Sequence, residues 1–439
     1  MLKGLQNYLA KNLIHNQMEL ILFTTNFPLG FSEQFLECEI LYLSKSFQRI
    51  TIIPLTDSGN PEPREIPENV TVLPPMLSVS LNHKTKLFLK SILNLKPLRF
   101  FISEFLHFRV YKNKLWFRNW LSFSSIGRAA MNSSTFRSIS ELVTPATLFY
   151  FYWGDKSSVL CPFLKHQFPA NRFIARFHGS DLYEVRTPGY MPYRQILIDH
   201  LDLLVFISAN GEKYLTERFP SIEQKSLVSR LGVEDQGINN PSPDNVLRIV
   251  SCSNLVTIKR LHHLVEALHY LDIPVIWNHF GDGPLFEEIK NQTDSLPDNI
   301  QVSFPGALKN IQLIHYYQHE KVDIFINVSS NEGIPVSIME AISFGIPVIA
   351  PVVGGIPEIL TAEHGYLISA EATPLEISNA IKSFYRLEFS EKERMRTAAR
   401  IFWKKHFNAE VNYSDFCSHI SKLIERDISD NSVGFPAIK

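Results

Sequence analysis

Short apolar segments alternate with longer amphipathic segments along most of the chain, and this alternation restricts the fold more than any other feature. Parallel strands need crossover connections, usually helices, so such alternation predicts parallel sheets covered by helices. We therefore expect an α/β protein. The strand-like segments are residues 18–25, 49–55, 146–152, 171–178 and 201–208, then 247–254, 274–281, 300–306, 322–329 and 347–353. Amphipathic stretches such as 32–46, 259–271 and 337–345 lie between them.

A linker-like segment divides the chain. Residues 229–245, SRLGVEDQGINNPSPDN, are rich in Gly, Pro, Asn and Asp, a composition typical of domain boundaries. The length of 439 residues suits two or three domains. We therefore predict one domain over residues 1–240 and a second over residues 241–400.

Composition excludes several classes of protein. The 43 basic and 44 acidic residues give a net charge of −1, which argues against a dedicated nucleic-acid binder. Residues 1–240 are mildly basic and the remainder mildly acidic. The four cysteines lie far apart in sequence, which suggests neither a zinc site nor a disulfide framework. The N-terminus lacks a signal-peptide pattern and no apolar run reaches ~18 residues, so we expect a cytoplasmic protein.

One segment of the first half stands apart. Residues 83–118 hold nine Lys or Arg, many Phe, Leu and Trp, and a single acidic residue, Glu104. One interpretation is a pair of helices with an apolar core face and a solvated basic face. The other is an insertion, at about residues 81–145, that rests on anionic lipid at the inner face of a membrane or meets a lipid-linked acceptor. The sequence leaves both open.

The strongest chemical signal is NEGIPVSIMEAISFGIPVIAPVVGGIPEIL at residues 331–360. Glu332 follows an expected strand, Pro335 suits the start of a helix, and Glu340 lies eight residues after the first glutamate. The amides and positive dipole end of such a helix favour a phosphate. A plain strand–helix–strand unit with two solvated glutamates is the alternative.

This string resembles the E-x7-E segment of the family 4 glycosyltransferases, retaining enzymes of the GT-B fold. The resemblance implies two Rossmann-like α/β domains facing each other across a cleft. It places Glu332 on the hydroxyls of the donor sugar as a catalytic residue and Glu340 on the nucleotide ribose. It also places the backbone of Gly333, Ile334, Pro335 and Val336 against sugar and phosphate.

Further donor-site residues follow in family order. In LRIVSCSNLVTIKRLHHLVEAL, residues 247–268, Lys259 matches a lysine that binds the diphosphate. The family usually has an arginine five residues earlier, where this chain has Asn254, and Arg260 is the residue that could supply the missing charge. In HFGDGPLFEEI, residues 279–289, Gly281 and Gly283 resemble a glycine turn near the nucleotide base.

The first half resembles the family at RFHGSDLYEVR, residues 176–186. His178 ends an expected strand, where ligands of open α/β sheets bind. The family histidine at this position lies against the donor sugar and the reacting centre. Asp181 is either a cleft residue or the cap of the following helix.

Two other segments of the first half supply candidates for the acceptor side. The loop within residues 26–40 resembles one that closes over diphosphate and acceptor, with its paired glycines reduced to Gly30. In the same segment, Glu33 fits a residue that opens the next helix. Trp153 and Asp155, in YFYWGDKSSV, either face the acceptor or stand behind it.

These observations and the resemblance together predict a glycosyltransferase. It would move a sugar from a nucleoside-diphosphate sugar to a saccharide, with a lipid-linked oligosaccharide favoured, in surface polysaccharide assembly such as capsule or O-antigen. No D-x-D triplet occurs in the sequence, so we expect no metal and no cofactor beyond the donor. Residues 401–439 resemble closing helices that cross back to the first domain. The alternatives are a non-catalytic GT-B subunit, which Asn254 and the single Gly30 favour, and a GT-B sugar-nucleotide epimerase or phosphorylase.

Overall fold

The computed structural model describes residues 18–30, 33–57, 64–78, 98–184, 189–242 and 244–432, the side chains of 98–99 and 426–432 excepted. They form two compact units. The first comprises the chain up to Ile207, then Gly211–Ser229 and the segment from Tyr413 onward. The second comprises Ser208–Asn210 and Arg230–Asn412. Part of the basic segment expected as an insertion, residues 79–97, lies outside the described residues.

The first unit is built on a parallel sheet of seven strands in the order β3-β2-β1-β4-β5-β6-β7. Its strands are β1 (Glu19–Thr24), β2 (Arg49–Pro54), β3 (Val70–Val72), β4 (Thr147–Phe151), β5 (Arg172–Phe177), β6 (Leu203–Phe206) and β7 (Ser226–Val228). The central strands are buried almost throughout, as expected for a parallel sheet covered on both faces.

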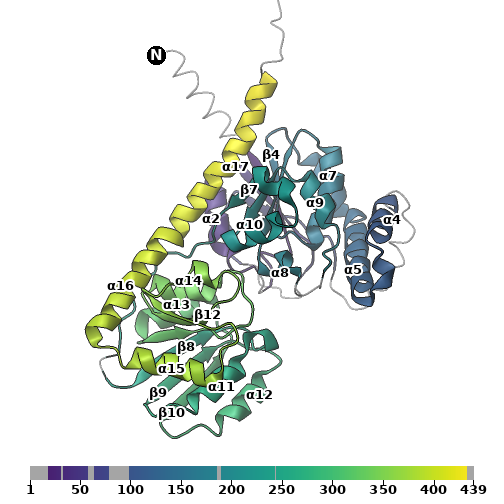
Figure 1. Ribbon diagram of the computed structural model, residues 1–439. Coiled ribbons are helices and arrows are strands. Elements are labelled where there is room, and N and C mark those ends of the chain that lie inside the picture. Colours follow the sequence, from purple (N-terminus) through teal and green to yellow (C-terminus); the bar gives the residue numbers. More distant parts are fainter. Residues whose placement is uncertain are drawn as a thin grey trace, which may run out of the picture. The chain divides into compact units, whose positions relative to one another are not determined.

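Helices connect these strands (Figure 1). They are α2 (Leu36–Ser46), α4 (Leu98–His107), α5 (Lys114–Met131), α6 (Ser134–Ser138), α7 (Cys161–Gln167), α8 (Gly179–Leu182), α9 (Arg194–His200) and α10 (Ala209–Thr216). The 3-10 turns are η1 (Val110–Lys112), η2 (Ile139–Glu141), η3 (Lys156–Leu160) and η5 (Pro220–Lys225). The pair α4 and α5 falls in the predicted insertion, and the two helices lie side by side (Figure 1).

The second unit is built on a parallel sheet of six strands in the order β10-β9-β8-β11-β12-β13. Its strands are β8 (Leu247–Cys252), β9 (Val275–Phe280), β10 (Ile300–Gly306), β11 (Ile324–Ile326), β12 (Val348–Pro351) and β13 (Gly365–Ile368). The prediction of two α/β domains with parallel sheets is confirmed. The strand expected over 322–329 is shorter, because the chain leaves the ladder after Ile326.

The helices of this second part are α11 (Leu261–Leu268), α12 (Phe286–Thr293), α13 (Asn310–His319), α14 (Val336–Ser343), α15 (Pro374–Tyr385), α16 (Phe389–His406) and α17 (Ala409–Ser432). Two 3-10 turns, η6 (Thr257–Lys259) and η7 (Ile356–Glu358), follow β8 and β12. The apolar core joins the inner faces of the helices to the sheet. Helix α17 begins in the second unit, and from Tyr413 the chain belongs to the first.

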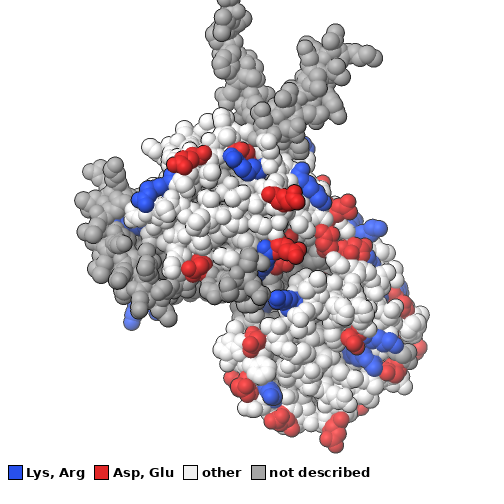
Figure 2. Space-filling model, turned by 180° about the vertical axis from the view of Figure 1, so that it is seen from behind, with Lys and Arg blue, Asp and Glu red and all other residues white. Residues whose placement is uncertain are grey.

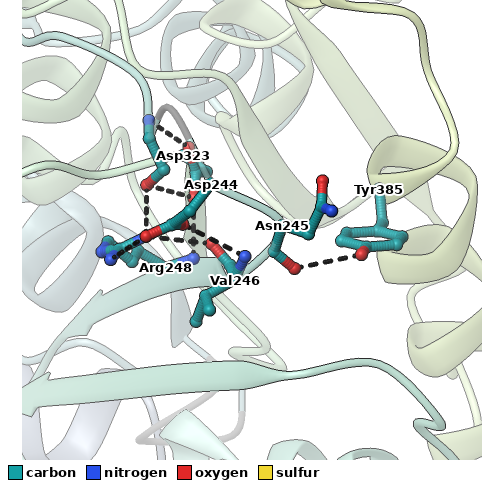
Figure 3. A network of polar contacts seen from close by, with 7 residues as sticks. Asp244, Asn245, Val246, Arg248, Asp323 and Tyr385 are labelled. Atoms are coloured by element: carbon teal, nitrogen blue, oxygen red, sulfur yellow. Dashed lines mark hydrogen bonds and ion pairs between the residues drawn. The ribbon is translucent and has the colours of Figure 1, made fainter.

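A polar network fixes the segment that enters β8 (Figure 3). Arg248 makes two bonds to the Asp244 carboxylate, at 2.7 and 2.9 Å. Asp323 accepts the backbone N–H of Arg248 at 2.8 Å. The Tyr385 hydroxyl donates to the carbonyl of Asn245 at 3.0 Å. These bonds tie the connecting segment to the second sheet and so define where β8 starts.

The surface carries both signs of charge. Figure 2 shows blue and red side chains interspersed on a mostly white face, with no broad field of one sign among the described residues seen there. No helix within the described ranges combines the length and the apolar character needed to cross a membrane.

Candidate active site

The loops that carry the predicted donor residues emerge from the carboxyl ends of four neighbouring strands of the second unit. Asn254 and Lys259 follow β8, Gly281 follows β9, Glu332 follows β11 and Gly354 follows β12. Because β9, β8, β11 and β12 are adjacent and parallel, these loops gather at one edge of the sheet. That edge is where ligands of open α/β sheets bind.

Lys259 and Glu332 form an ion pair in this group of loops. The Lys259 Nζ lies 2.5 Å from Glu332 Oε1, and the two side chains are 23% and 11% exposed. Asn327 Nδ2 donates to the same carboxylate oxygen at 3.2 Å. The carboxylate therefore has one oxygen engaged, and it lies beside a cation that could meet a phosphate.

Helix α14 begins four residues after Glu332. Pro335 is its N-cap, with extended backbone, and Val336 is its first residue. The Ile334 and Pro335 side chains are buried, whereas Gly333 and Val336 are half-buried. The first amides of a helix have no intrahelical acceptor, so this end can donate to an anion.

Glu340 lies within α14 and is only 5% exposed. Asn310, the first residue of α13, donates its side-chain amide to Glu340 Oε1. Burial raises the pKa of Glu340 to about 7, partly offset by that hydrogen bond. The carboxyl group can therefore change charge near neutrality, and when ionised it accepts hydrogen bonds from two hydroxyls.

Two glycines after β12 hold the Glu332 segment in place. A Cβ on Gly354 would lie 1.7 Å from the carbonyl oxygen of Glu332, and Gly354 has φ of +51°. Gly355 donates its N–H to the carbonyl of Gly333 at 2.8 Å. Only glycine allows this close approach of two backbones.

The predicted glycine turn after β9 packs in the same way. A Cβ on Gly281 would meet the carbonyl oxygen of Ser253 at 1.9 Å, and one on Gly283 would meet that of Leu255 at 2.5 Å. The close approach of this turn to the loop after β8 therefore explains why both positions are glycine. Asn254, between the two contacted residues, has an exposed side chain.

Arg260 binds backbone carbonyls of its own unit. Its guanidinium donates to the carbonyls of Val328 at 2.9 Å, Ser329 at 3.3 Å and Ala370 at 2.8 Å. These bonds, together with φ of +49°, make it an anchor between the loops after β8, β11 and β13. The structure therefore gives no support to Arg260 as a substitute for the arginine absent at Asn254, and Lys259 is the better candidate for the diphosphate.

In the first unit, the remaining candidates follow three adjacent strands. Gly30 and Glu33 follow β1, Trp153 and Asp155 follow β4, and His178 follows β5. The strand order β1-β4-β5 brings their loops together at the carboxyl edge of this sheet.

His178 is buried with no hydrogen bond to its ring. It is 4% exposed, and neither Nδ1 nor Nε2 has a hydrogen-bond partner among the residues that the structure describes. Aromatic rings surround it, with centroid distances of 4.2 Å to Trp153, 5.1 Å to Tyr152 and 5.3 Å to Phe35. Burial, and then the charge of Arg176, lower the pKa of His178 well below its usual value. The imidazole is therefore neutral at pH 7 and has one donor and one acceptor to offer.

Asp181 joins the loops after β4 and β5. It accepts the N–H of Gly154 and the N–H of His178, each at 2.7 Å. Burial and then the charge of Asp155 raise the pKa of Asp181 to about 7. Burial also raises the pKa of Asp155, whose residue is half-buried. The cap at the start of α8, which the sequence left as one of two readings of Asp181, is present.

The β1–α2 loop is organised by Glu33, which the sequence suggested only as a residue that opens a helix. Its carboxylate accepts the indole N–H of Trp153 at 2.8 Å and three backbone N–H groups of residues 25–27. Gly30 has φ of +80°, and its carbonyl accepts from Arg64 at 2.6 Å. Glu33, Asn310 and Asn327 were missed as functional candidates, although Asn327 could have been found from its place at a strand end.

The two groups of residues belong to different units and each is described in its own unit. His178, Asp181, Trp153, Asp155 and Gly30 come together in the first. The remaining candidates gather in the second unit. Among them, Asn254 has an exposed side chain and Arg260 binds backbone carbonyls. Within the described ranges, no cluster of three or more His, Cys, Asp or Glu could hold a metal ion.

Comparison with known proteins gives a family for part of the chain. Residues 234–402 match the family model described as "Glycosyl transferases group 1". The chain is 26% identical over 258 residues to WcaL of Escherichia coli strain K12, named for colanic acid biosynthesis. It is 25% identical over 267 residues to AmsK of Erwinia amylovora, named for amylovoran biosynthesis. These alignments cover 56% and 57% of this chain. They cover 63% and 64% of the two relatives, so the chain spans slightly less than two thirds of the length of each relative.

Solved structures share the fold at low identity. The Anabaena protein Alr3699/HepE, solved in complex with UDP, superposes with a TM-score of 0.60 at 14% identity. That match covers 92% of this chain and all of the other. The chain thus has the GT-B fold, with one Rossmann-like α/β domain in each unit.

Proposed function

We propose that this chain, a glycosyltransferase with a group 1 domain over residues 234–402, transfers a sugar from a nucleoside diphosphate to a saccharide in surface polysaccharide assembly. Support for the pathway comes from WcaL and AmsK, whose names refer to colanic acid and amylovoran. The observation that carries the proposal is the Lys259–Glu332 pair beside the start of α14, with buried Glu340 on the same helix.

The donor half of the reaction is proposed as follows. Lys259 and the first amides of α14 bind the diphosphate, Glu332 accepts hydroxyls of the sugar, and Glu340 accepts those of the ribose. When the bond between the anomeric carbon and the β-phosphate oxygen breaks, negative charge grows on that oxygen. A cation and oriented amides stabilise such charge more than they stabilise the intact donor.

Retention of the anomeric configuration is a finer part of the proposal, and it rests on the resemblance. The acceptor hydroxyl would attack from the face that the diphosphate leaves, and its proton would pass to the departing phosphate oxygen. Neutral His178 suits a hydrogen-bonding partner of the donor sugar in this scheme. Its low pKa makes it a poor holder of a proton, so we assign it no acid–base step.

A lipid-linked acceptor, met at the inner face of a membrane, is proposed from the hairpin formed by α4, η1 and α5. Its exposed large apolar residues are Ile102, Leu106, Phe108, Tyr111, Leu115 and Phe117. Its exposed basic residues between them are Arg109, Lys112, Lys114 and Arg118. The one acidic residue of 98–131 is Glu104, which is 3% exposed. This combination suits a surface that contacts anionic lipid.

A non-catalytic GT-B subunit remains the second candidate, because Asn254 replaces the usual arginine and is exposed. The two candidates differ in what they require of the donor residues. A catalyst needs Lys259, Glu332 and His178 for turnover, whereas a subunit needs only its partner surface. An epimerase would need further acid–base carboxylates, for which we have no candidates.

A thermal-shift screen tests the proposal. The purified chain is measured with UDP, GDP, dTDP, ADP and their common sugar conjugates, with and without a chelator. A ligand that binds only the folded chain raises the melting temperature by mass action. We expect a shift with one diphosphate that the chelator does not reduce. If no nucleotide shifts the melting temperature, the catalytic proposal fails and the non-catalytic subunit replaces it.

A further inference from the structure

We propose that Glu33 is a positioning residue, which holds the indole of Trp153 against His178 and thereby fixes the orientation of the imidazole. The effect on turnover rests on the proposed function. The effect on the orientation of the two rings does not, and it can be tested separately.

The Glu33 carboxylate is saturated with donors. Oε1 accepts the N–H of Thr25 at 2.8 Å and the indole N–H of Trp153 at 2.8 Å. Oε2 accepts the N–H of Asn26 at 3.0 Å and that of Phe27 at 2.9 Å. A carboxylate offers acceptors on both oxygens, whereas the side chain of glutamine has one oxygen and one NH2 group. In Glu33→Gln that NH2 group would face N–H donors of the loop or of Trp153 and could not accept from them. At 3% exposure, water cannot easily take over these bonds.

Glu33 also adopts a backbone conformation that non-glycine residues rarely populate, with φ of +62°. Such a conformation is unfavourable for a residue with a Cβ and persists where surrounding contacts require it. Arg64 supplies further contacts, donating to the carbonyls of Glu33 at 3.2 Å and of Gly30 at 2.6 Å. The residue is therefore held from both its side chain and its backbone, as a positioning role requires.

Trp153 is fixed from two directions. Its side chain donates to Glu33, and the N–H of the next residue, Gly154, donates to Asp181. Asp181 in turn accepts the backbone N–H of His178. Two buried carboxylates thus hold the Trp–His pair, Asp181 through the backbone N–H groups of Gly154 and His178 and Glu33 through the indole of Trp153.

His178 depends on this arrangement because no residue in the described part of the chain makes a hydrogen bond to its ring. Packing against Trp153, Tyr152 and Phe35 therefore sets the orientation of the imidazole. Trp153 is the nearest of the three, with a centroid distance of 4.2 Å. Releasing the indole from Glu33 would therefore let the imidazole move without breaking any bond of its own.

Kinetics of matched variants test the proposal. Glu33→Gln, Trp153→Phe and the double variant are compared for diphosphate release from the sugar nucleotide that gives the largest thermal shift. Misplacement by about 1 Å can cost roughly 100-fold in rate, so we expect Glu33→Gln to lower kcat about 10- to 100-fold. KM for the donor should change less than kcat, because Lys259, Glu332 and Glu340, the residues proposed to bind the diphosphate, sugar and ribose, belong to the other unit. Trp153→Phe loses the indole bond to Glu33 but keeps the three backbone bonds of that carboxylate. It should lower kcat alone, and the double variant should be no worse than Glu33→Gln.

Two controls separate this effect from a general loss of stability. Glu19→Gln removes a carboxylate at the opposite end of β1, where it pairs with Arg49 at 2.7 Å and accepts from Thr144. Trp120→Phe removes an indole bond to the carbonyl of Phe101 at 3.0 Å. Both should keep the kcat of the wild type on a soluble acceptor. An unchanged kcat in Glu33→Gln or Trp153→Phe, or additive losses in the double variant, would overturn the positioning role.

Fluorine NMR of chains labelled with 5-fluorotryptophan tests the geometry without any substrate. The chain has five tryptophans, and Trp153→Phe identifies the resonance of Trp153. We expect Glu33→Gln to shift or broaden that resonance alone and Glu19→Gln to leave it unchanged. A Trp153 resonance that is the same in Glu33→Gln and wild type would refute the inference. If the wild type turns over no sugar nucleotide, the proposed function fails, and this spectrum still decides the role of Glu33.

Discussion

Glu340 combines deep burial with a proposed role, the binding of ribose hydroxyls, that needs its negative charge. Its pKa is raised to about 7, so between pH 4.5 and 7 the folded chain keeps a proton that the unfolded chain releases. The free energy of unfolding should therefore fall as pH rises through this window, by up to about 3 kcal/mol for Glu340. Nucleotide affinity should rise in the same window, because only the carboxylate accepts two ribose hydroxyls.

Comparison of wild type with Glu340→Gln isolates this dependence from that of Asp181. Urea unfolding at pH 5 and pH 8 should show a smaller loss of stability with pH in the variant. Titration with the stabilising nucleotide should show weaker binding that no longer strengthens between pH 5 and pH 7. Asn310→Ala removes the hydrogen-bond donor to Glu340, so it should raise the pH at which nucleotide affinity reaches half of its increase. Parallel pH profiles for wild type and Glu340→Gln would contradict the prediction.

Lys259 is the second residue whose role can be separated from structure. Hydrogen bonds to charged groups contribute about 1.5–3 kcal/mol, so Lys259→Ala should weaken nucleoside-diphosphate binding roughly tenfold to a hundredfold. Affinity for the free nucleoside should not change, because that ligand lacks the diphosphate. Lys290→Ala, on the exposed face of α12, is the matched control. If calorimetry finds that Lys259→Ala loses equal affinity for the nucleoside and for the nucleoside diphosphate, Lys259 does not bind the diphosphate.

The residues differ in how far sequence could predict their surroundings. Glu332 and Glu340 stand out because their spacing, a proline and a helix pattern occur in one continuous string. The contacts of Arg260 could not be predicted, because the carbonyls it binds lie 68–110 positions further along the chain. Glu33 resembles an ordinary helix-opening residue, since its partner Trp153 is 120 residues away.

Among the loops, the one after β12 is the most sensitive to small changes. Gly354→Ala would bring a methyl group onto the Glu332 carbonyl, so the segment with Glu332 must shift. We expect a loss of a few kcal/mol of unfolding free energy, together with weaker binding of the stabilising nucleotide. Gly237→Ala is the control, because it also has positive φ but nothing within 4 Å of an added Cβ. Comparable nucleotide affinity in both variants would show that the Glu332 segment does not depend on this packing.

The α4–α5 hairpin gives a prediction for membrane contact. Sedimentation with vesicles of 30% phosphatidylglycerol in phosphatidylcholine should pull down the wild type and release it at high salt. The pair Phe108→Ser and Phe117→Ser should weaken binding by losing buried apolar area, at ~25 cal/mol per Å². Lys112→Glu and Lys114→Glu should weaken it only at low salt. Phe389→Ser, at a more exposed phenylalanine on α16, should bind as wild type. Equal binding to neutral vesicles would refute the electrostatic part.

At this scale the strand–helix alternation predicted most of what forms. The strands expected within 18–25, 49–55 and 171–178 are present as β1, β2 and β5, because continuous apolar runs mark buried parallel strands. The short edge strands β3, β7 and β13 were not predicted. They are three or four residues long and only partly buried, so they lack the long apolar run by which central strands are recognised.

The whole molecule divides into two units, and apart from the short stretch Ser208–Asn210 the chain passes once to the second unit and once back to the first. The border near Ser229 and Arg230 lies within the linker-like segment, about ten residues before the limit predicted at 240. The chain returns to the first unit at Tyr413, whereas the sequence suggested a closing segment from 401. Composition marked the linker, but no local pattern marks the point within one continuous helix where its contacts change.

This return covers a buried ion pair of the first unit. Arg176 binds Glu39 at 3.0 Å with both side chains fully buried, and the guanidinium lies 4.4 Å from the ring centroid of Phe416. Phe416→Ala would leave a cavity beside this pair, so we expect a loss of about 3–5 kcal/mol.

Hydrogen exchange would show where that loss falls. Amides of β5 and α2, which carry Arg176 and Glu39, should lose protection in Phe416→Ala, while α14 keeps the protection of the wild type. Phe389→Ala, with its ring 64% exposed, should stay within about 0.5 kcal/mol of wild type. If protection in β5 and α2 is unchanged in Phe416→Ala, the packing of Phe416 from α17 does not stabilise the Arg176–Glu39 pair or the first unit around it.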